Sequence, residues 1–492
     1  MVDGDNKYEG DIVIPAEITY NSRNLKVTSI GGSTFSGCSL LSSISLSNSV
    51  ISIGRFAFSG CSSLSSVIIP NSVISIGKSA FKDCSSLTNI TIPNSVTSIE
   101  ESTFENCSSL TNVIIPNSVT SIDRKSFFRC SALANITIPN SVISIGEYAF
   151  SYCSSLASIS LPNAVLSIGK YAFSNCSSLA SISLPNSLTS IEGYTFSKCS
   201  SLTSVSLPTS LISIGEYVFS NCSSLETIKI PNSVISIGKC TFSGCSLLEH
   251  IKFSKALKRI EYGLFSGCAK LATLEIPGSV TEISQYYSEL NKPSIDTFDD
   301  VSLSQLRLMY SSQRLILGYN RADSFESSQW VESWPREIKV LYIDRLLNDE
   351  IPVPNLVKLE IGESLKNVSL IEGRNWGNIS SIASLDTIIS YAKEPPTLPT
   401  MKNKQYMDMI VKVPADALEA YKTADSWKNF WNLSALDPDE SGVNEIKSES
   451  APKEIVRRYD INGNKVDENY NGIVIVRFSD GSVRKMINNA GW

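Results

Sequence analysis

Residues 73–93 decide the fold, and they read Val-Ile-Ser-Ile-Gly-Lys-Ser-Ala-Phe-Lys-Asp-Cys-Ser-Ser-Leu-Thr-Asn-Ile-Thr-Ile-Pro. The same pattern recurs eleven times at a constant interval, which is the step from Cys61 to Cys84. Three residue types mark its register: cysteine from Cys38 to Cys268, phenylalanine from Phe35 to Phe265, and leucine from Leu41 to Leu271. A fixed period of roughly 20 to 50 residues is the signature of a repeat architecture, in which each unit packs on its neighbours.

The parts of one unit can be assigned from physical chemistry. Leu87, Ile90 and Ile92 alternate as the inward residues of a short strand. Pro93 ends the strand, where its missing N–H interrupts no ladder, and nine of the eleven units carry this proline. A Leu-x-x-Ile-x-Ile core is typical of leucine-rich repeats. We predict a leucine-rich repeat solenoid with parallel β strands, a short 3-10 or loop convex side, and rungs ~4.8 Å apart.

The twelve cysteines raise the question of a disulfide framework. In a stacked column each thiol has two equivalent neighbours, and eleven thiols cannot pair completely. The twelfth, Cys240, lies outside the column. One thiol per rung also places the sulfur atoms in a line, whereas zinc needs four ligands around a point. We therefore expect reduced, buried packing residues and no metal.

The repeated Ser-Val-x-Ser-Ile-Gly-x-x-Ala-Phe-x-x-Cys-Ser-Ser-Leu-x-x-Ile-x-Ile-Pro-Asn resembles the BspA-like, or Treponema-type, leucine-rich repeats. The resemblance covers residues 12–277, and residues 12–15 and 27–31 look like the family's entry segment. Residues 413–428 also resemble the final repeat of Bacteroides members. The resemblance implies a Bacteroidetes protein that is secreted or displayed at the cell surface and binds host matrix proteins or other microbes.

The sequence predicts five regions. They are an N-terminal entry or cap segment at 1–27, eleven regular repeats at 28–277, irregular repeats with a closing cap at 278–436, a linker at 437–453 and a small all-β C-terminal module at 454–492. Strand-like segments in the irregular part fall at 315–317, 340–343, 356–361, 388–390 and 410–414. We expect residues 416–430 to form a closing helix, because the end of a solenoid must be covered.

The C-terminal module contains alternating segments at 455–459, 465–466, 472–478 and 482–487. Asn462-Gly463 and Asp480-Gly481 are typical hairpin turns. Residues 458–465 resemble the C-terminal segments of many secreted Bacteroidetes proteins, including those sorted by type IX secretion. A role in sorting is therefore a hypothesis for this module.

Composition sets aside several classes of partner. The chain has 492 residues, a net charge of −6, and no long cluster of lysine and arginine, which argues against nucleic acid. The sequence contains no run of about 18 apolar residues, so it predicts no membrane-spanning helix. The start of the sequence looks like a mature N-terminus behind an added methionine. We therefore expect a protein at the outer cell surface or outside the cell, with a signal peptide removed.

The sequence predicts no enzyme, cofactor or metal. Its one histidine, His250, is expected at an exposed strand position, so the commonest general base is missing everywhere else. No nucleophile elbow, phosphate-binding loop or zinc-protease motif occurs. Asp460-x-Asn462-x-Asn464 copies the start of a calcium loop, but Lys465 occupies the glycine position and Asn471 the final glutamate position.

The candidate binding residues lie on the predicted concave strand face. In the first rungs this face carries mainly Ser, Thr, Asn and Ala. Three later rungs change character and become charged and individually distinct. We interpret this divergence either as recognition of a partner or as drift toward the end of the repeat array. The residues concerned are Glu226, Thr227, Lys229, Glu249, His250, Lys252, Thr273 and Glu275.

Three functions remain open from the sequence. The first is an adhesin-like surface protein that presents a rigid solenoid face to a host extracellular-matrix protein or to another cell. The second is a carbohydrate-binding component of a glycan-handling system, in which repeated hydroxyls add many weak contacts. The third is a structural spacer. The large aromatic residues after residue 285 more often fill a core than form an interface.

Overall fold

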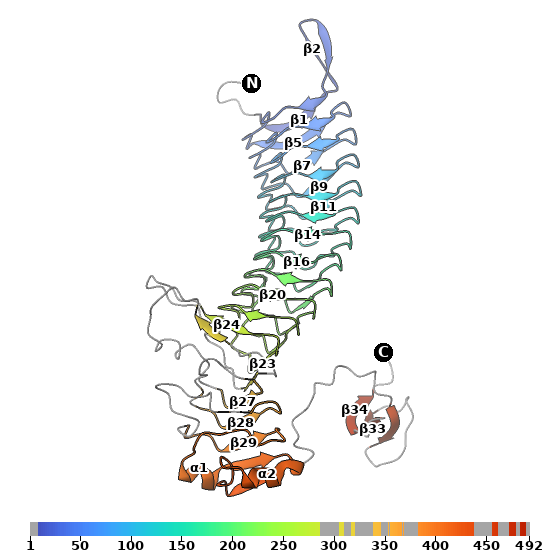
Figure 1. Ribbon diagram of the computed structural model, residues 1–492. Helices are drawn as coiled ribbons and strands as arrows, with labels where there is room; N and C mark the ends of the chain where they lie inside the picture. Colours follow the sequence, from blue (N-terminus) through green and yellow to red (C-terminus); the bar gives the residue numbers. More distant parts are fainter. Residues whose placement is uncertain are drawn as a thin grey trace. The chain divides into compact units, whose positions relative to one another are not determined.

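The computed structural model describes residues 8–285, 305–308, 316–319, 338–345, 353, 355–366, 368 and 382–436, together with three strands within 455–488. The chain divides into two compact units, residues 1–435 and 436–492. The first unit is a parallel β solenoid in which the rungs follow one another in chain order (Figure 1). The predicted fold is confirmed.

Nine of the eleven regular repeats contribute a first strand, which lies at or just after the conserved leucine. Successive first strands pair in parallel at an offset of one repeat, as between Asn89 and Asn112. Between β11 and β15 this ladder is reduced to the isolated bridge Thr137–Ser160. The first strands are β5 (Leu41–Leu46), β7 (Ser66–Ile68), β9 (Asn89–Thr91), β11 (Asn112–Ile114), β15 (Ser181–Ser183), β17 (Ser204–Ser206), β19 (Thr227–Lys229), β21 (His250–Lys252) and β23 (Thr273–Ile276).

A second ladder follows the proline turn, and the sequence pattern does not predict it as strand. Its very short strands also pair in parallel at an offset of one repeat, for example Ser98 with Ser121. The serine of each Ser-Ile pair is exposed or half-buried and the isoleucine is buried. They are β4 (Ser29–Ile30), β6 (Ser52–Ile53), β8 (Ser75–Ile76), β10 (Ser98–Ile99), β12 (Ser121–Ile122), β13 (Ser144–Ile145), β14 (Ser167–Ile168), β16 (Ser190–Ile191), β18 (Ser213–Ile214), β20 (Ser236–Ile237) and β22 (Arg259–Ile260).

The third side of each rung is a chain of hydrogen-bonded turns around the conserved phenylalanine. In the regular repeats no 3-10 helix occupies it among the described residues. Its N–H groups donate to the next rung: the Phe58 N–H reaches the Ala80 carbonyl at 2.8 Å, and the Gly60 N–H reaches the Lys82 carbonyl at 2.7 Å. The residues two before and two after the phenylalanine have positive φ in all eleven units. This alternation lets turn backbone form a ladder between rungs.

The core consists of columns that run through the stack. The phenylalanine rings from Phe35 to Phe265 stack with centroids 5.2–6.3 Å apart. From Cys61 to Cys268, each column cysteine donates its S–H to the phenylalanine carbonyl 26 residues earlier, at 3.1–3.2 Å. All twelve cysteines are buried free thiols. The cysteine therefore serves as an apolar filler that also satisfies a backbone carbonyl.

The N-terminal end begins with β1 (Gly10–Ile14), which pairs in parallel with β5 and so forms the first rung. An antiparallel hairpin of β2 (Glu17–Tyr20) and β3 (Arg23–Lys26) interrupts this rung. All eight of its strand residues are exposed. The sequence predicts the entry strand but not the hairpin.

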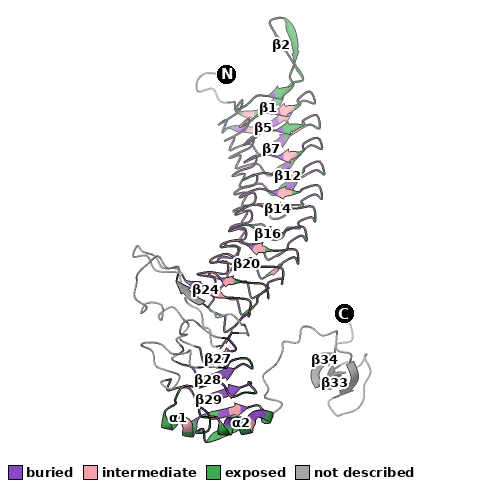
Figure 2. Cartoon of the chain, viewed as in Figure 1, coloured by how far each residue is buried: buried purple, intermediate pink, exposed green. Residues whose placement is uncertain are grey.

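Beyond the regular repeats a continuous seven-stranded parallel sheet extends from β23. The segments predicted at 340–343, 356–361, 388–390 and 410–414 correspond to four of its strands, while β25 and β31 were not predicted. The strands that follow β23 in this sheet are β25 (Gln305–Leu308), β27 (Val340–Ile343), β28 (Lys358–Ile361), β29 (Thr387–Ser390), β30 (Ile410–Val413) and β31 (Asn432–Ala435). The residues of β27, β28 and β29 are largely buried (Figure 2). The second ladder continues through β24 (Glu282–Gln285) to β26 (Ile316–Tyr319).

Short helices accompany the last rungs: α1 (Asn403–Asp408), the 3-10 turn η3 (Ala415–Ala417) and α2 (Leu418–Thr423). The expected helix over 416–430 is thus wrong in length. It ends at Thr423 because Trp427 and Phe430 then turn into the core. The indole N–H of Trp427 donates to the Pro396 carbonyl at 2.6 Å.

The second unit contains a three-stranded antiparallel sheet. Its strands are β32 (Ile455–Asp460), β33 (Gly472–Phe478) and β34 (Val483–Asn488), in the order β32-β33-β34. An all-β C-terminal module agrees with the prediction. The predicted segment 465–466 and both predicted hairpin turns lie outside the described residues.

Candidate binding surface

The eight candidate residues come together on one face of three successive rungs, which we call the charged rungs. Strand register places Thr227 beside His250 and Lys229 beside Lys252. The Glu249 N–H donates to the Glu226 carbonyl at 2.9 Å, so these two residues are also neighbours. All of these side chains are exposed, as is Glu275, and Thr273 is half-buried.

The first two charged rungs place like charges beside each other, whereas Glu275 of the third rung occupies the position that matches Lys252. Glu226 neighbours Glu249, and Lys229 is in register with Lys252. Among the residues that the structure describes, no ion pair includes any of these four side chains. Like charges on adjacent strands repel each other and destabilise the fold slightly. Folding stability therefore does not explain why Glu226 neighbours Glu249 and Lys229 neighbours Lys252.

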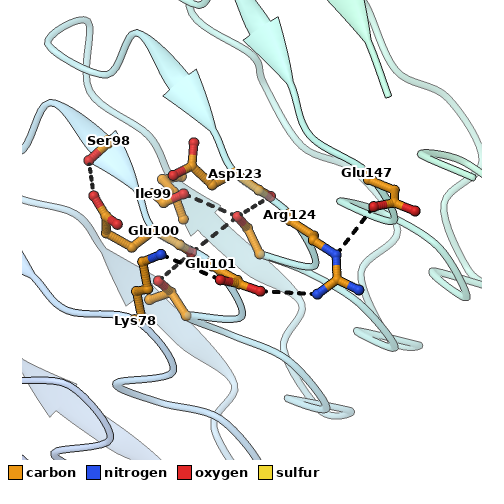
Figure 3. A network of polar contacts seen from close by, with 10 residues as sticks. Lys78, Ser98, Ile99, Glu100, Glu101, Asp123, Arg124 and Glu147 are labelled. Carbon is orange, nitrogen blue, oxygen red and sulfur yellow. Dashed lines mark hydrogen bonds and ion pairs between the residues drawn. The ribbon is translucent and has the colours of Figure 1, made fainter. Parts of the chain in front are cut away.

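The turn side of the same solenoid arranges its charges in the opposite way. Lys78, Glu101, Arg124 and Glu147 occupy one position in four consecutive repeats and alternate in sign (Figure 3). Their ion pairs measure 3.4, 3.0 and 3.3 Å in that order. Hydrogen bonding to Arg124 lowers the pKa of Glu101 below its ordinary value. Neighbouring rungs can thus complement one another where only folding is at stake, which makes the like pairs on the strand face distinctive.

A polar groove of about 580 Å³ opens on the neighbouring rungs of the first ladder. Each rung contributes similar groups, namely strand serines and the residues that follow the proline or leucine turn. The polar lining residues are Ser158, Ser160, Asn163, Ser181, Ser183, Asn186, Ser206 and Thr209. The groove offers repeated hydroxyl and amide groups at the strand spacing of ~4.8 Å.

Four stacked tyrosines were not among the predicted site residues, because only the aromatic residues after residue 285 were considered as a binding surface. Tyr148, Tyr171, Tyr194 and Tyr217 occupy the position two before the phenylalanine in successive repeats. Their ring centroids are 4.5, 4.5 and 4.6 Å apart, with interplanar angles of 5°, 14° and 9°. The recurrence of tyrosine at one position of four consecutive repeats was the signal that could have revealed them.

The later aromatic residues divide between core and surface. Trp427 is buried, as expected for core filling, whereas Trp431 is 76% exposed. Tyr286, Tyr287, Trp330, Trp334 and Trp376 lie outside the described residues, as do the side-chain surroundings of Tyr319.

The described part of the chain offers no group of three or more His, Cys, Asp or Glu side chains that could hold a metal ion. Burial raises the pKa of the column thiols from Cys61 to Cys268, to about 12 for Cys153, which keeps them protonated. Within the same residues, no helix is long and apolar enough to cross a membrane.

Comparison with known proteins agrees with this geometry. The family model for the BspA type leucine-rich repeat region matches residues 16–134, 121–237 and 166–292, in six copies. No curated protein is matched. A solved leucine-rich repeat protein from Bacteroides ovatus is 25% identical, with a TM-score of 0.53, over 75% of this chain and 91% of that chain.

Two further solved structures are more distant. A leucine-rich cell surface protein from Faecalibacterium prausnitzii is 22% identical over 79% of this chain and 88% of that chain, with a TM-score of 0.37. The pneumococcal vaccine antigen PcpA is 18% identical over 87% of this chain and 88% of that chain, with a TM-score of 0.38. On the strength of the family match across more than half of its length and of its regularly repeated rungs, the chain belongs to the BspA-type leucine-rich repeat family.

Proposed function

We propose that this protein is a secreted or cell-surface binding protein, adhesin-like in role, whose charged rungs contact a host extracellular-matrix protein or a protein on another cell. The like-charge pairs Glu226–Glu249 and Lys229–Lys252 carry the proposal. They cost a little stability where the preceding rungs hold neutral residues, and a partner with complementary charges would neutralise them. Family membership supports the same role.

The rigidity of the surface also supports binding. Lys229 projects from β19 between Ile228 and Ile230, which are both buried in the core. A partner therefore meets fixed backbone, and little backbone entropy is lost on association.

A substitution set drawn from the chain itself tests the proposal. The preceding rung holds Thr203 and Ser206 at the matched positions. The variant Glu226→Thr, Lys229→Ser, Glu249→Thr, Lys252→Ser, here called the neutral-face variant, removes two charges of each sign and leaves the net charge unchanged. As a matched control, Glu216→Ser with Lys239→Ser removes an ion pair of 3.1 Å from the turn side.

The measurement is binding of the full chain to an array of matrix proteins, mucins and glycans in physiological salt. We expect saturable binding to a matrix protein, a loss of at least ~10-fold in affinity for the neutral-face variant, and no change for the control. Equal binding by all three proteins would contradict the assignment of the site. No binding anywhere on the array would favour the spacer.

The polar groove favours a second candidate, a carbohydrate ligand. Its serines and asparagines repeat at the rung spacing, so a polymer with repeated hydroxyls would meet the same groups on three rungs. Binding to glycans alone, with competition by soluble polysaccharide, would support this candidate. Replacing Ser160, Ser183 and Ser206 by valine should then abolish that binding while leaving protein binding unchanged.

A further inference from the structure

The four stacked tyrosines lie on the turn side of the solenoid, away from the strand face discussed so far. Each has a positive φ, between 55° and 61°, at the position where other repeats carry Ser33, Ser79 or Ser102. The rings are half-buried and face one another within 4.6 Å. Ring faces are therefore covered by neighbouring rings, and the outward parts of the column are ring edges and hydroxyls.

Ring edges and ring faces attract different ligands. The face of an aromatic ring carries the negative part of its quadrupole and the edge carries the positive part. A stacked column thus offers little to a cation or to a sugar ring that needs a face. Its edges and phenolic O–H groups suit an anion, because they present positive potential and hydrogen-bond donors.

The hydroxyls themselves form a row. Each of the four phenols carries one O–H group that can donate a hydrogen bond to an anion. Burial raises the pKa of all four phenols, so they stay protonated donors at neutral pH.

The cations around this column also lack carboxylate partners. Lys125 and Arg129 contact the rings of Phe128, Tyr148 and Tyr152 at 5.1–5.9 Å. Lys170 and Lys198 are exposed, and no ion pair within the described residues includes either. By contrast, the carboxylates Glu147 and Glu216 of the same rungs are already ion-paired, with Arg124 and Lys239, and Glu192 accepts a hydrogen bond from Ser190.

We propose that these tyrosines, with Lys125, Arg129, Lys170 and Lys198, form a second binding site, here called the tyrosine strip, for an acidic polypeptide segment. The cations that lack carboxylate partners and the outward ring edges both favour an anion as the ligand. An acidic polypeptide fits better than an anionic glycan, because covered ring faces deny a sugar its stacking contact. The site is independent of the charged rungs and of the function proposed for them.

The experiment measures binding of the full chain to poly-L-glutamate and to heparin in physiological salt. Tyr171→Ser with Tyr194→Ser is the main variant, because serine is native at this position in other repeats and the net charge does not change. We expect poly-L-glutamate binding to weaken ~10-fold or more, and Tyr171→Phe with Tyr194→Phe, which keeps the stack, to weaken it ~3-fold. The neutral-face variant should bind poly-L-glutamate like the wild type, which separates this site from the first.

A third variant tests the proposal even if the tyrosine variants are too unstable for binding to be measured. Lys170→Ser with Lys198→Ser leaves the aromatic column intact and should weaken poly-L-glutamate binding, with a smaller dependence on salt. Equal binding of wild type and all three strip variants would overturn the proposal. Binding of heparin without binding of poly-L-glutamate would also overturn it, in favour of an anionic glycan.

Discussion

Single residues in this repeat are explained by the hydrogen bonds that they form with the neighbouring rung. A cysteine such as Cys153 fills the core and donates to the Phe127 carbonyl at 3.2 Å, which alanine could not do. The serine of the Asn-Ser turn does the same on another side, since Ser141 donates to the Val119 carbonyl at 2.6 Å. The near-identity of the units thus follows from hydrogen bonds between rungs as well as from apolar packing.

The left-handed turn positions give a prediction at this scale. Asn175 has φ of 61°, and the same column holds glycine at Gly60 and Gly244. Asn175→Val should lower the free energy of unfolding by about 1–3 kcal/mol, because a β-branched residue is strained at positive φ. Asn175→Gly should stay close to the wild type. Urea unfolding of both variants measures the difference, and equal stabilities would show that the position carries no strain.

The thiol column makes stability depend on alkaline pH. Burial raises the pKa of Cys153 and of Cys199 to about 12, whereas an unfolded thiol titrates near 9.0. Below pH 9 both states hold the proton. Between about pH 9 and 12 the unfolded chain releases it first, so the unfolded state gains up to ~1.4 kcal/mol per thiol for each pH unit. Stability should fall as pH rises through this window.

Thermal melts from pH 8 to pH 11 test this dependence. Replacing Cys153 and Cys199 by alanine should lower the melting temperature at pH 8 but make its further decline with pH shallower. An unchanged pH slope in that variant would mean that other groups, such as the tyrosines, cause the alkaline loss.

At the scale of elements, the closing cap depends on one buried ring. Trp427 is fully buried and packs edge-on against Tyr421, with ring centroids 4.8 Å apart. The Tyr421 hydroxyl in turn donates to the Ala392 carbonyl at 2.8 Å. These contacts hold the segment after α2 against the last rungs.

The two tryptophans of the cap give a matched pair of variants. Trp427→Ala should lower the free energy of unfolding by about 3–5 kcal/mol, because it leaves a large cavity and an unpaired Pro396 carbonyl. Trp431→Ala, at a 76% exposed side chain, should change it by less than about 0.5 kcal/mol. Urea unfolding compares the two. A similar loss for both would contradict the packing described for the cap.

The elements also show where sequence reasoning succeeds and fails. The first strands and the core columns were predictable because Leu87, Ile90 and Ile92 repeat with a fixed period. The second ladder was not, since two residues are too few for a strand pattern and only pairing with the next rung makes Ser98-Ile99 a strand. β25 and the short helix α1 were missed for a related reason, because no repeat register extends to them.

The candidate surfaces divide in the same way. The charged rungs were found because Glu249 and Lys252 differ from the residues at matched positions in earlier units. Their like-charge contacts needed the register of the strands. The tyrosine strip was visible in the sequence as a column, but its meaning depended on stacking distances and on which cations lack partners.

At the scale of the whole molecule, the solenoid unit combines a framework of complementary contacts with one strand-face region that breaks this rule. Ion pairs between rungs, such as Lys82–Glu105 at 3.2 Å, stabilise the turn side modestly. The side chains Glu226, Lys229, Glu249 and Lys252 of the charged rungs lack this stabilisation by ion pairs. Our central claim is that they do so because a partner protein uses those charges.

Calorimetric melting of the wild type and the neutral-face variant, each with and without the matrix protein identified on the array, tests this claim most directly. A ligand that binds only the folded chain raises its melting temperature. We predict that the partner raises the melting temperature of the wild type but not of the variant, and that the free variant melts no lower than the free wild type. An equal rise in both proteins would contradict the claim, as would a free variant that melts markedly lower.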